Sequence, residues 1–185
     1  RDLPAVGPEE DEAALGAPVS GQWRGVAFDR WGGVVLAGND GQDGLVALYD
    51  AAGALAWQRT WASSLGFADQ LTSVRALDSG DVVAAGWTAL DDGVQWWQAQ
   101  SQLLVAGWNR GGTPRWEHRD PSTGSDIERT SELVETGAGS IASLGTRSRN
   151  NFVNAGYTPI GVHVLSLRPQ SRSFCFGDAL SGACP

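Results

Sequence analysis

Short apolar runs separated by glycine-containing turns fill most of the chain from about residue 19 onwards. The clearest stretch predicts four strands, over residues 73–77, 82–87, 103–108 and 114–118. Asp78-Ser79-Gly80 and Arg110-Gly111-Gly112 lie between paired strands and suit hairpin turns. Outside the N-terminal segment, no stretch shows the sustained 3.6-residue period of an amphipathic helix. The pattern therefore predicts an all-β protein.

The same pattern of strands and turns repeats along the chain. Residues 25–38 align with residues 73–86 at an offset of 48, and residues 46–57 align with residues 105–116 at an offset of 59. The second copy therefore carries an insertion of 11 residues between its second and third strands. Internal repetition of this kind is typical of architectures built from one repeated supersecondary unit.

A weaker third copy follows. Residues 140–145 lie 59 positions after residues 81–86, and residues 164–167 lie twice that distance after residues 46–49. Phe174-Cys175 then stands where the first two copies have their Trp. On this alignment the third copy also has a long connection between its second and third strands.

These repeats define the organisation that we expect. The first residues contain Pro4, Pro8 and Pro18 and an acidic run over residues 9–12, which predicts a flexible linker. The predicted boundaries are an acidic N-terminal segment over 1–18, three β-repeats over 19–173 (about 19–64, 65–123 and 124–173) and a Cys-containing segment over 174–185.

Each of the first two copies contains a Val-Val-x-Ala-Gly strand and a Gly-x-x-x-Trp strand, and an Asp-x-x-Gly turn recurs between strands. This pattern resembles the bacterial β-propeller repeat found in secreted and cell-surface proteins. The resemblance covers about residues 20–175, and the third copy lacks the Trp and a turn glycine near Ser171. It implies four-stranded, propeller-like blades and says almost nothing about activity.

Three blades are fewer than the about four to eight from which propellers usually close. The chain is then part of a longer protein, or two copies pair to give six blades, or another partner covers the open blades. A β-trefoil is an alternative, because that fold needs three units, and a β-sandwich is another. The blade motifs favour the partial propeller.

Charge and hydropathy exclude several function classes. Thirteen Lys and Arg against 21 Asp and Glu give a net charge of −8, which argues against nucleic acid and anionic membranes as partners. No apolar run approaches the roughly 18 residues of a transmembrane helix. The absence of Met indicates a processed mature form or a piece of a longer chain.

Two cysteines bear on the compartment. Cys175 and Cys184 lie close together, and a zinc site would have only His118 and His163 to add to them. We therefore predict a disulfide, which indicates an exported protein that is periplasmic, at the cell surface or secreted. Residues 1–20 show no signal peptide, so we expect any such leader to have been removed.

No catalytic motif stands out. There is no Gly-x-Ser-x-Gly nucleophile elbow and no phosphate-binding glycine loop. His118 and His163 are expected to be structural or surface residues. We predict no cofactor and no enzymatic activity, with a hydrolase of unrecognised site as a remaining alternative.

Two polar loops are the candidates for binding calcium. One holds Asp40 and Asp43, and the insertion of the second copy holds Asp91 and Asp92. The first loop lacks the spacing and the final Glu of a calcium-binding helix-loop-helix, and the second is similar. Turn formation by Asp and Gly is the favoured explanation, and no metal site is predicted.

The insertion of the second copy is the best candidate for binding. It contains Gln95, Trp96 and Trp97, and two adjacent Trp on a strand point to opposite faces. An exposed Trp there would stack on a sugar ring or anchor a protein, although both rings packing under the loop is the simpler account. The equivalent loop of the third copy supplies Arg147, Arg149, Asn150, Asn151, Phe152 and Asn154.

The sequence thus favours an exported, non-enzymatic structural or protein-binding module. We expect an accessory subunit of a periplasmic or cell-surface complex, with a protein partner or a second copy covering its open blades. A carbohydrate-binding module that uses an exposed Trp is the first alternative, and a hydrolase is the second.

Overall fold

The computed structural model describes residues 20–62, 68–89, 101–119, 126–136, 140–151 and 156–167. For residues 126–129, 131, 147–151 and 156–167 the backbone alone is described. All regular secondary structure in these ranges is β-strand, as the hydrophobic pattern predicts. The all-β fold class is therefore confirmed.

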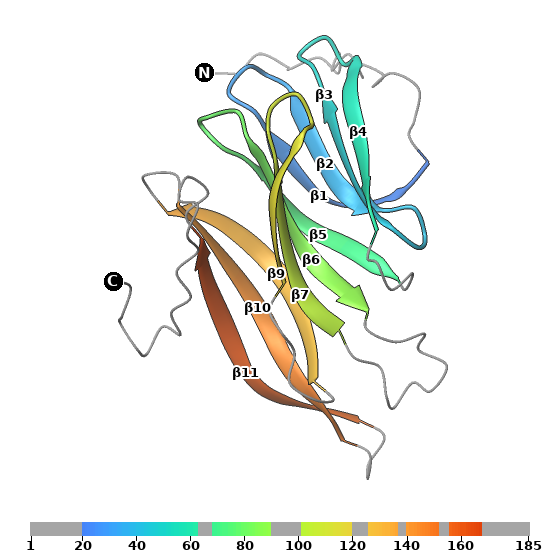
Figure 1. Ribbon diagram of the computed structural model, residues 1–185, viewed down its shortest axis with the longest axis vertical. Coiled ribbons are helices and arrows are strands. Elements are labelled where there is room, and N and C mark those ends of the chain that lie inside the picture. Colours follow the sequence, from blue (N-terminus) through green and yellow to red (C-terminus); the bar gives the residue numbers. More distant parts are fainter. Residues whose placement is uncertain are drawn as a thin grey trace, which may run out of the picture.

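Antiparallel pairing groups the strands into three sheets that follow one another along the chain (Figure 1). The first sheet is a meander of β1 (Gln22–Phe28), β2 (Val34–Asn39), β3 (Gly44–Tyr49) and β4 (Leu55–Trp61). The second is a meander of β5 (Asp69–Ala76), β6 (Val82–Ala89), β7 (Ser101–Trp108) and β8 (Pro114–Arg119). The third consists of β9 (Asp126–Thr136), β10 (Ser140–Asn151) and β11 (Gly156–Leu167). A single parallel residue pair, Ser101 with Ile127, joins the second sheet to the third.

The second sheet lies between the other two and is apolar on both faces. Alternate residues of a strand point to opposite faces, so the continuous apolar runs of β6 and β7 supply two cores. One core joins the first and second sheets, and Val82, Ala84 and Leu104 belong to it. The other joins the second and third sheets and includes Val83 and Leu103. Adjacent sheets therefore pack face to face.

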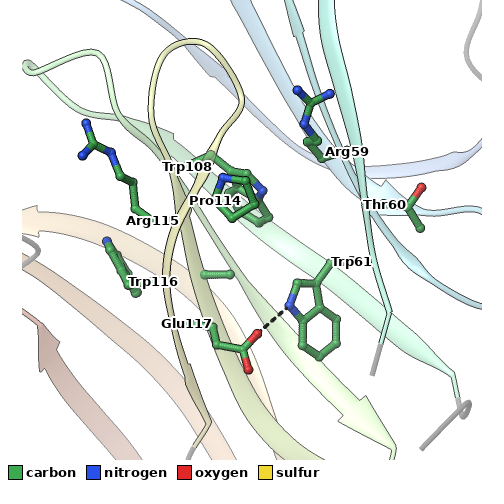
Figure 2. A pocket seen from close by; sticks show the side chains of 10 residues that line it. Arg59, Thr60, Trp61, Trp108, Pro114, Arg115, Trp116 and Glu117 are labelled. Atoms are coloured by element: carbon green, nitrogen blue, oxygen red, sulfur yellow. Dashed lines mark hydrogen bonds between the residues drawn. The ribbon is translucent and has the colours of Figure 1, made fainter. Parts of the chain in front are cut away.

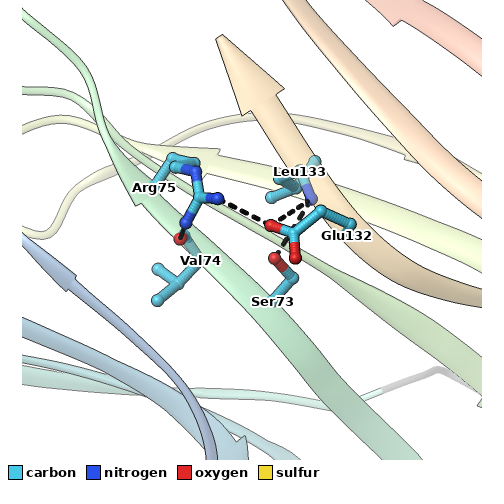
Figure 3. A network of polar contacts seen from close by, with 5 residues as sticks. All are labelled: Ser73, Val74, Arg75, Glu132 and Leu133. Carbon is cyan, nitrogen blue, oxygen red and sulfur yellow. Dashed lines mark hydrogen bonds and ion pairs between the residues drawn. The ribbon is translucent and has the colours of Figure 1, made fainter.

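Polar contacts add to the second of these junctions (Figure 3). Arg75 of β5 forms an ion pair with Glu132 of β9, with 2.6 Å between Nη2 and Oε1. Beside it the backbone N–H of Leu133 donates to the Ser73 hydroxyl, at 3.1 Å. The first strands of the second and third sheets are thus linked directly.

The copies share irregularities of backbone as well as sequence. A bulge in the first strand of each sheet leaves one residue out of the ladder: Arg24, Thr72 and Ser131 respectively. In the first two sheets a Cβ on the glycine opposite this bulge, Gly38 or Gly86, would collide with a carbonyl oxygen of the bulged strand. This close approach explains the glycine that ends each Val-Val-x-Ala-Gly strand.

Four hairpin turns are also built alike. Gly32, Gly53, Gly80 and Gly112 have φ between 76° and 88°, a left-handed conformation that favours glycine. Each donates its N–H to the carbonyl three residues earlier. These are the tight turns that the glycine pattern of the first two copies predicts, and the prediction is confirmed.

Other sequence-based expectations need correction or refinement. All four predicted strands of the second copy occur, and each extends beyond its predicted range at one end. The first of them ends at Ala76, one residue earlier than predicted. The long connection expected in the third copy does not exist in that form, because β10 runs to Asn151 and β11 begins at Gly156. The described strands form stacked layers and do not close into a propeller ring or a trefoil barrel. Sandwich-like packing describes each pair of adjacent sheets.

Candidate functional site

Each sheet has two faces, which can be named by chain direction. The upstream face of the second sheet packs on the first sheet, and its downstream face packs on the third. Val74 lies on the upstream face and is 1% exposed. Leu104, also on the upstream face, is buried in the same core. The exposure of residues on this covered face can therefore be compared with that of the equivalent residues in the other copies.

The upstream face of the first sheet carries the same kinds of residue but is partly open. Val26 stands 48 positions before Val74, in the same place of the repeat, and is 56% exposed. Phe28, on the same face of β1, is 73% exposed. Val26 pairs with Leu36 and Phe28 with Val34, so these four side chains form one apolar patch across β1 and β2.

Next to these two strands the upstream face is buried at β3, and beyond β3 it is exposed again at Leu55 of β4, which pairs with Tyr49 and is 42% exposed. Leu45, Ala47 and Tyr49 of β3 point to the same side, since Val46 and Leu48 between them face the first core. All three are buried. We call the four residues Val26, Phe28, Val34 and Leu36 the upstream patch.

The third sheet presents exposed apolar residues on its downstream face, at the other end of the stack, where Leu144 pairs with the charged Glu132. Leu133 and Ile141 face the second core, and their neighbours Val134 and Ala142 pair with each other on the opposite side. Val134 is 48% exposed and Leu144 is 41% exposed. We call Val134, Ala142 and Leu144 the downstream patch.

A cleft of about 300 Å³ opens between β4 of the first sheet and β7 and β8 of the second (Figure 2). Three tryptophans, Trp61, Trp108 and Trp116, contribute to its lining. The remaining lining residues are Arg59, Thr60, Ala106, Gly107, Pro114, Arg115 and Glu117. The cleft thus combines aromatic surface with groups of both charges.

A small polar network fixes one wall of the cleft. Trp61 Nε1 donates to Glu117 Oε2 at 3.0 Å, the dashed line in Figure 2. Arg119 forms an ion pair with Glu117 at 2.9 Å, and its guanidinium lies 5.0 Å from the centre of a Trp61 ring. The carboxylate is therefore held by both sheets, with an indole from one and a guanidinium from the other.

The far rim is also tied across the two sheets. Trp57 Nε1 donates to the Arg110 carbonyl at 2.8 Å, and Arg59 Nε donates to the Gly112 carbonyl at 2.7 Å. Both acceptors belong to the turn between β7 and β8. Arg115 is exposed, whereas Trp116 is part-buried and packs against the second core. The cleft has the aromatic and hydrogen-bonding groups that a polar, ring-containing ligand needs.

Most of the binding residues chosen from the sequence lie outside the described ranges. These are Gln95, Trp96, Trp97 and Phe152, together with Asp91, Asp92 and the predicted disulfide residues Cys175 and Cys184. Arg147, Arg149 and Asn151 lie on strand β10, so their predicted placement in a loop is wrong. The strand continues there because residues 147 to 151 pair with β11, and residues 147 to 149 also pair with β9.

The two histidines lie on different sheets. His118 is buried on β8, paired with Val105, and His163 lies on β11, paired with Gly145. The position of His118 agrees with a structural role. In the part of the chain that the structure describes, no three His, Cys, Asp or Glu side chains gather as a metal site would require.

Asp40 acts in its turn as the sequence indicated. Its Oδ1 accepts hydrogen bonds from the N–H groups of Asp43 at 2.9 Å and of Gln42 at 3.1 Å. These bonds, with that to Asp43 the stronger influence, lower the pKa of the Asp40 carboxyl below its ordinary value of 3.8. The carboxylate thus stabilises the turn between β2 and β3.

Sequence reasoning expected open blades that a partner covers but named none of the residues of the two patches, and it missed the cleft. The upstream patch was detectable in principle, because Val26, Val34 and Leu36 stand at the positions of the repeat where the second copy has the buried Val74, Val82 and Ala84. The cleft was not, since Trp61 has no Trp counterpart in the second copy and Glu117 meets it only across two sheets.

No helix long and apolar enough to cross a membrane occurs among the described residues. Comparison of the chain with protein-family models and with curated protein sequences finds no match. Function must therefore be argued from the surfaces and the cleft.

Proposed function

We propose that this protein is an exported, non-enzymatic β-repeat module that binds another protein through the exposed end faces of its stack of propeller-like sheets. In this role it is an accessory subunit of a periplasmic or cell-surface complex. The observation that carries the proposal is the exposure of Val26 and Phe28, 56% and 73%, on a face whose copy in the second sheet is covered.

Energetics support a docking role for this patch. Moving a Val or Phe side chain from water to a packed interface contributes about 1.5–3 kcal/mol. Val26 and Phe28 lie on one strand and beside the part-buried Val34 and Leu36, so one partner surface covers them together. Contiguous apolar surface of this kind is typical of protein interaction sites, whereas scattered single residues are ordinary.

The support for export comes from the sequence. It comes from the likeness to secreted and cell-surface repeats and from the pair Cys175 and Cys184, whose predicted disulfide lies outside the described residues. Mass spectrometry of the protein isolated without reductant tests this part. A linked peptide pair supports export, and two free thiols in freshly isolated protein contradict it.

Site-specific photo-crosslinking tests the docking role. A photoreactive amino acid replaces Phe28, and the matched control carries it at Thr113, an exposed turn residue of the second sheet. We expect a discrete crosslinked protein from position 28 in the cells that make the chain, and none from position 113. The proposal fails if position 28 gives no adduct or only the same adducts as position 113.

A second candidate function is glycan binding in the tryptophan-lined cleft. It is favoured by a cleft lining in which Trp61 and Trp108 lie with Glu117 and Arg115, because sugar rings stack on indoles and bond to such charged groups. A panel of neutral and acidic oligosaccharides tested against the wild type and Glu117→Gln checks this. Saturable binding that weakens in the variant supports it, and the absence of binding across the panel excludes it for those sugars.

A further inference from the structure

The chain makes the same kind of interface twice. The downstream face of the first sheet packs on the upstream face of the second, through Val35 and Val46 against Val74 and Leu104. The downstream face of the second packs on the upstream face of the third, through Val83 and others against Leu133. In each case a downstream face meets an upstream face, never two faces of one kind.

Two faces of the stack take part in neither junction: the upstream face of the first sheet and the downstream face of the third. The upstream patch of the first sheet exposes Val26 and Phe28, and the downstream patch of the third exposes Val134 and Leu144. No described strand packs on the outer side of either patch. One patch is thus an upstream face and the other a downstream face, the same combination that meets at each junction inside the chain.

We propose that the upstream patch of one copy of this chain is covered by the downstream patch of a second copy, so that two copies close head to tail into a ring of six sheets. This inference rests on the proposed docking function and names its partner. The occupant is a second copy because the required downstream face is present on the chain itself.

Symmetry explains why two such contacts form together. A contact between unlike faces produces either a closed ring or an open filament. With two copies related by a two-fold axis, the third sheet of each covers the first sheet of the other, and both exposed ends are buried at once. Six sheets lie within the range of about four to eight from which rings of repeated β-sheets close.

The state of association of the purified chain is the first measurement. Light scattering after size exclusion is expected to give twice the chain mass of 19.5 kDa. Phe28→Asp on the upstream patch and Leu144→Asp on the downstream patch should each give monomers. We expect each to raise the dissociation constant at least about 100-fold, because each places a charge in an apolar contact. Thr113→Asp adds the same charge in an exposed turn and should remain dimeric.

Mixing the two variants identifies which faces meet. In a mixed pair the intact downstream patch of Phe28→Asp meets the intact upstream patch of Leu144→Asp, so one of the two contacts is restored. Heterodimers should therefore form in the mixture although neither variant dimerises alone. Pairing of the upstream patch with itself predicts a dimeric Leu144→Asp and no rescue on mixing, and either result overturns the proposal.

Folding and the broader docking role are separable from this result. Phe28 and Leu144 are substantially exposed in the single chain, so both variants should keep the wild-type circular dichroism spectrum. Weak complexes have dissociation constants on the order of 100 micromolar. A wild-type chain that is still monomeric at that concentration overturns the second-copy inference. If photo-crosslinking at position 28 then captures a different protein, the docking function stands, and if it captures nothing, both fail.

Discussion

Val26 and Val74 occupy the same position in successive copies of one repeat, yet one is 56% exposed and the other 1%. Both lie on the first strand of a sheet, next to a bulge, and point to the upstream face. The difference lies in what precedes each sheet. The first sheet covers Val74 from outside, and no described strand does this for Val26.

This comparison shows that burial in the stack is a property of neighbouring sheets rather than of a single copy. A sheet of this repeat has two apolar faces and so depends on two neighbours, as in other repeat architectures. The middle sheet has both, and the end sheets have one each among the described residues. The predictions below test this contrast, from the largest expected effect to the smallest.

The largest expected effect is the difference in stability loss when Asp replaces each of the two equivalent valines. Val74→Asp should lower the free energy of unfolding by about 4 kcal/mol or more, because it buries a carboxylate in the core between two sheets. Val26→Asp should change it by about 0.5 kcal/mol or less when measured on monomers. Urea unfolding at low protein concentration measures both, and equal losses would contradict the contrast.

The glycines opposite the strand bulges should come next. A Cβ at Gly86 collides with the Gln70 carbonyl, and one at Gly38 collides with the Gln22 carbonyl. Replacement by Ala should therefore cost about 1–3 kcal/mol at both sites. Because the bulge is internal to one sheet, the end sheet and the middle sheet should be affected alike.

Gly111→Ala is the matched control for these glycines. A Cβ there would lie 3.4 Å from Asn109 Oδ1, which is ordinary contact, and φ is not left-handed. We expect a change within about 1 kcal/mol. Thermal unfolding of the three Ala variants measures the loss of stability at each site. A loss at Gly111 as large as that at Gly86 would refute the steric explanation.

The ion pair of Figure 3 should make a smaller contribution. Arg75 and Glu132 have side chains that are 38% and 47% exposed, so solvent screens their attraction. A double-mutant cycle with Arg75→Ala and Glu132→Ala should give a coupling of about 0.5 kcal/mol that declines in high salt. A coupling above about 2 kcal/mol would show that this junction depends on charge more than on its apolar core.

The smallest effect concerns pH and the turn of the first sheet. The pKa of Asp40 is lower in the folded chain than its ordinary value of 3.8, so the ionised carboxylate favours folding. This contribution is fully present above pH 3.8 and is lost as the pH falls through the folded pKa. The stability advantage over Asp40→Asn should therefore shrink on acidification below that value, and an advantage that grows would contradict the assignment.

Much of the fold was predictable from local patterns. The strands of the first two copies follow from short apolar runs, and the turns follow from glycines that adopt left-handed φ, such as Gly80 and Gly112. The third copy was harder, because its polar residues 147–151 look like a loop. They are strand because β9 and β11 supply hydrogen-bonding partners, which a single segment does not reveal.

The candidate sites divide in the same way. The sequence drew attention to adjacent tryptophans at 96 and 97, which lie outside the described residues, because such a pair is visible in one segment. The cleft escaped notice because Trp61 and Glu117 are 56 positions apart and meet only where two sheets pack. Residues joined by tertiary contact leave no local pattern.

The sequence by itself determined the all-β class, the repeated strand and turn pattern, and which positions are apolar on each face. Alternation along strands and the conformational limits of glycine are local effects, so local sequence suffices for them. The tertiary structure decided that the repeats stack as layers, that Val74 is covered while Val26 is exposed, and that three tryptophans and the Glu117 carboxylate line one cleft. Those outcomes depend on which faces meet, and the hydrophobic effect that drives the meeting is non-directional.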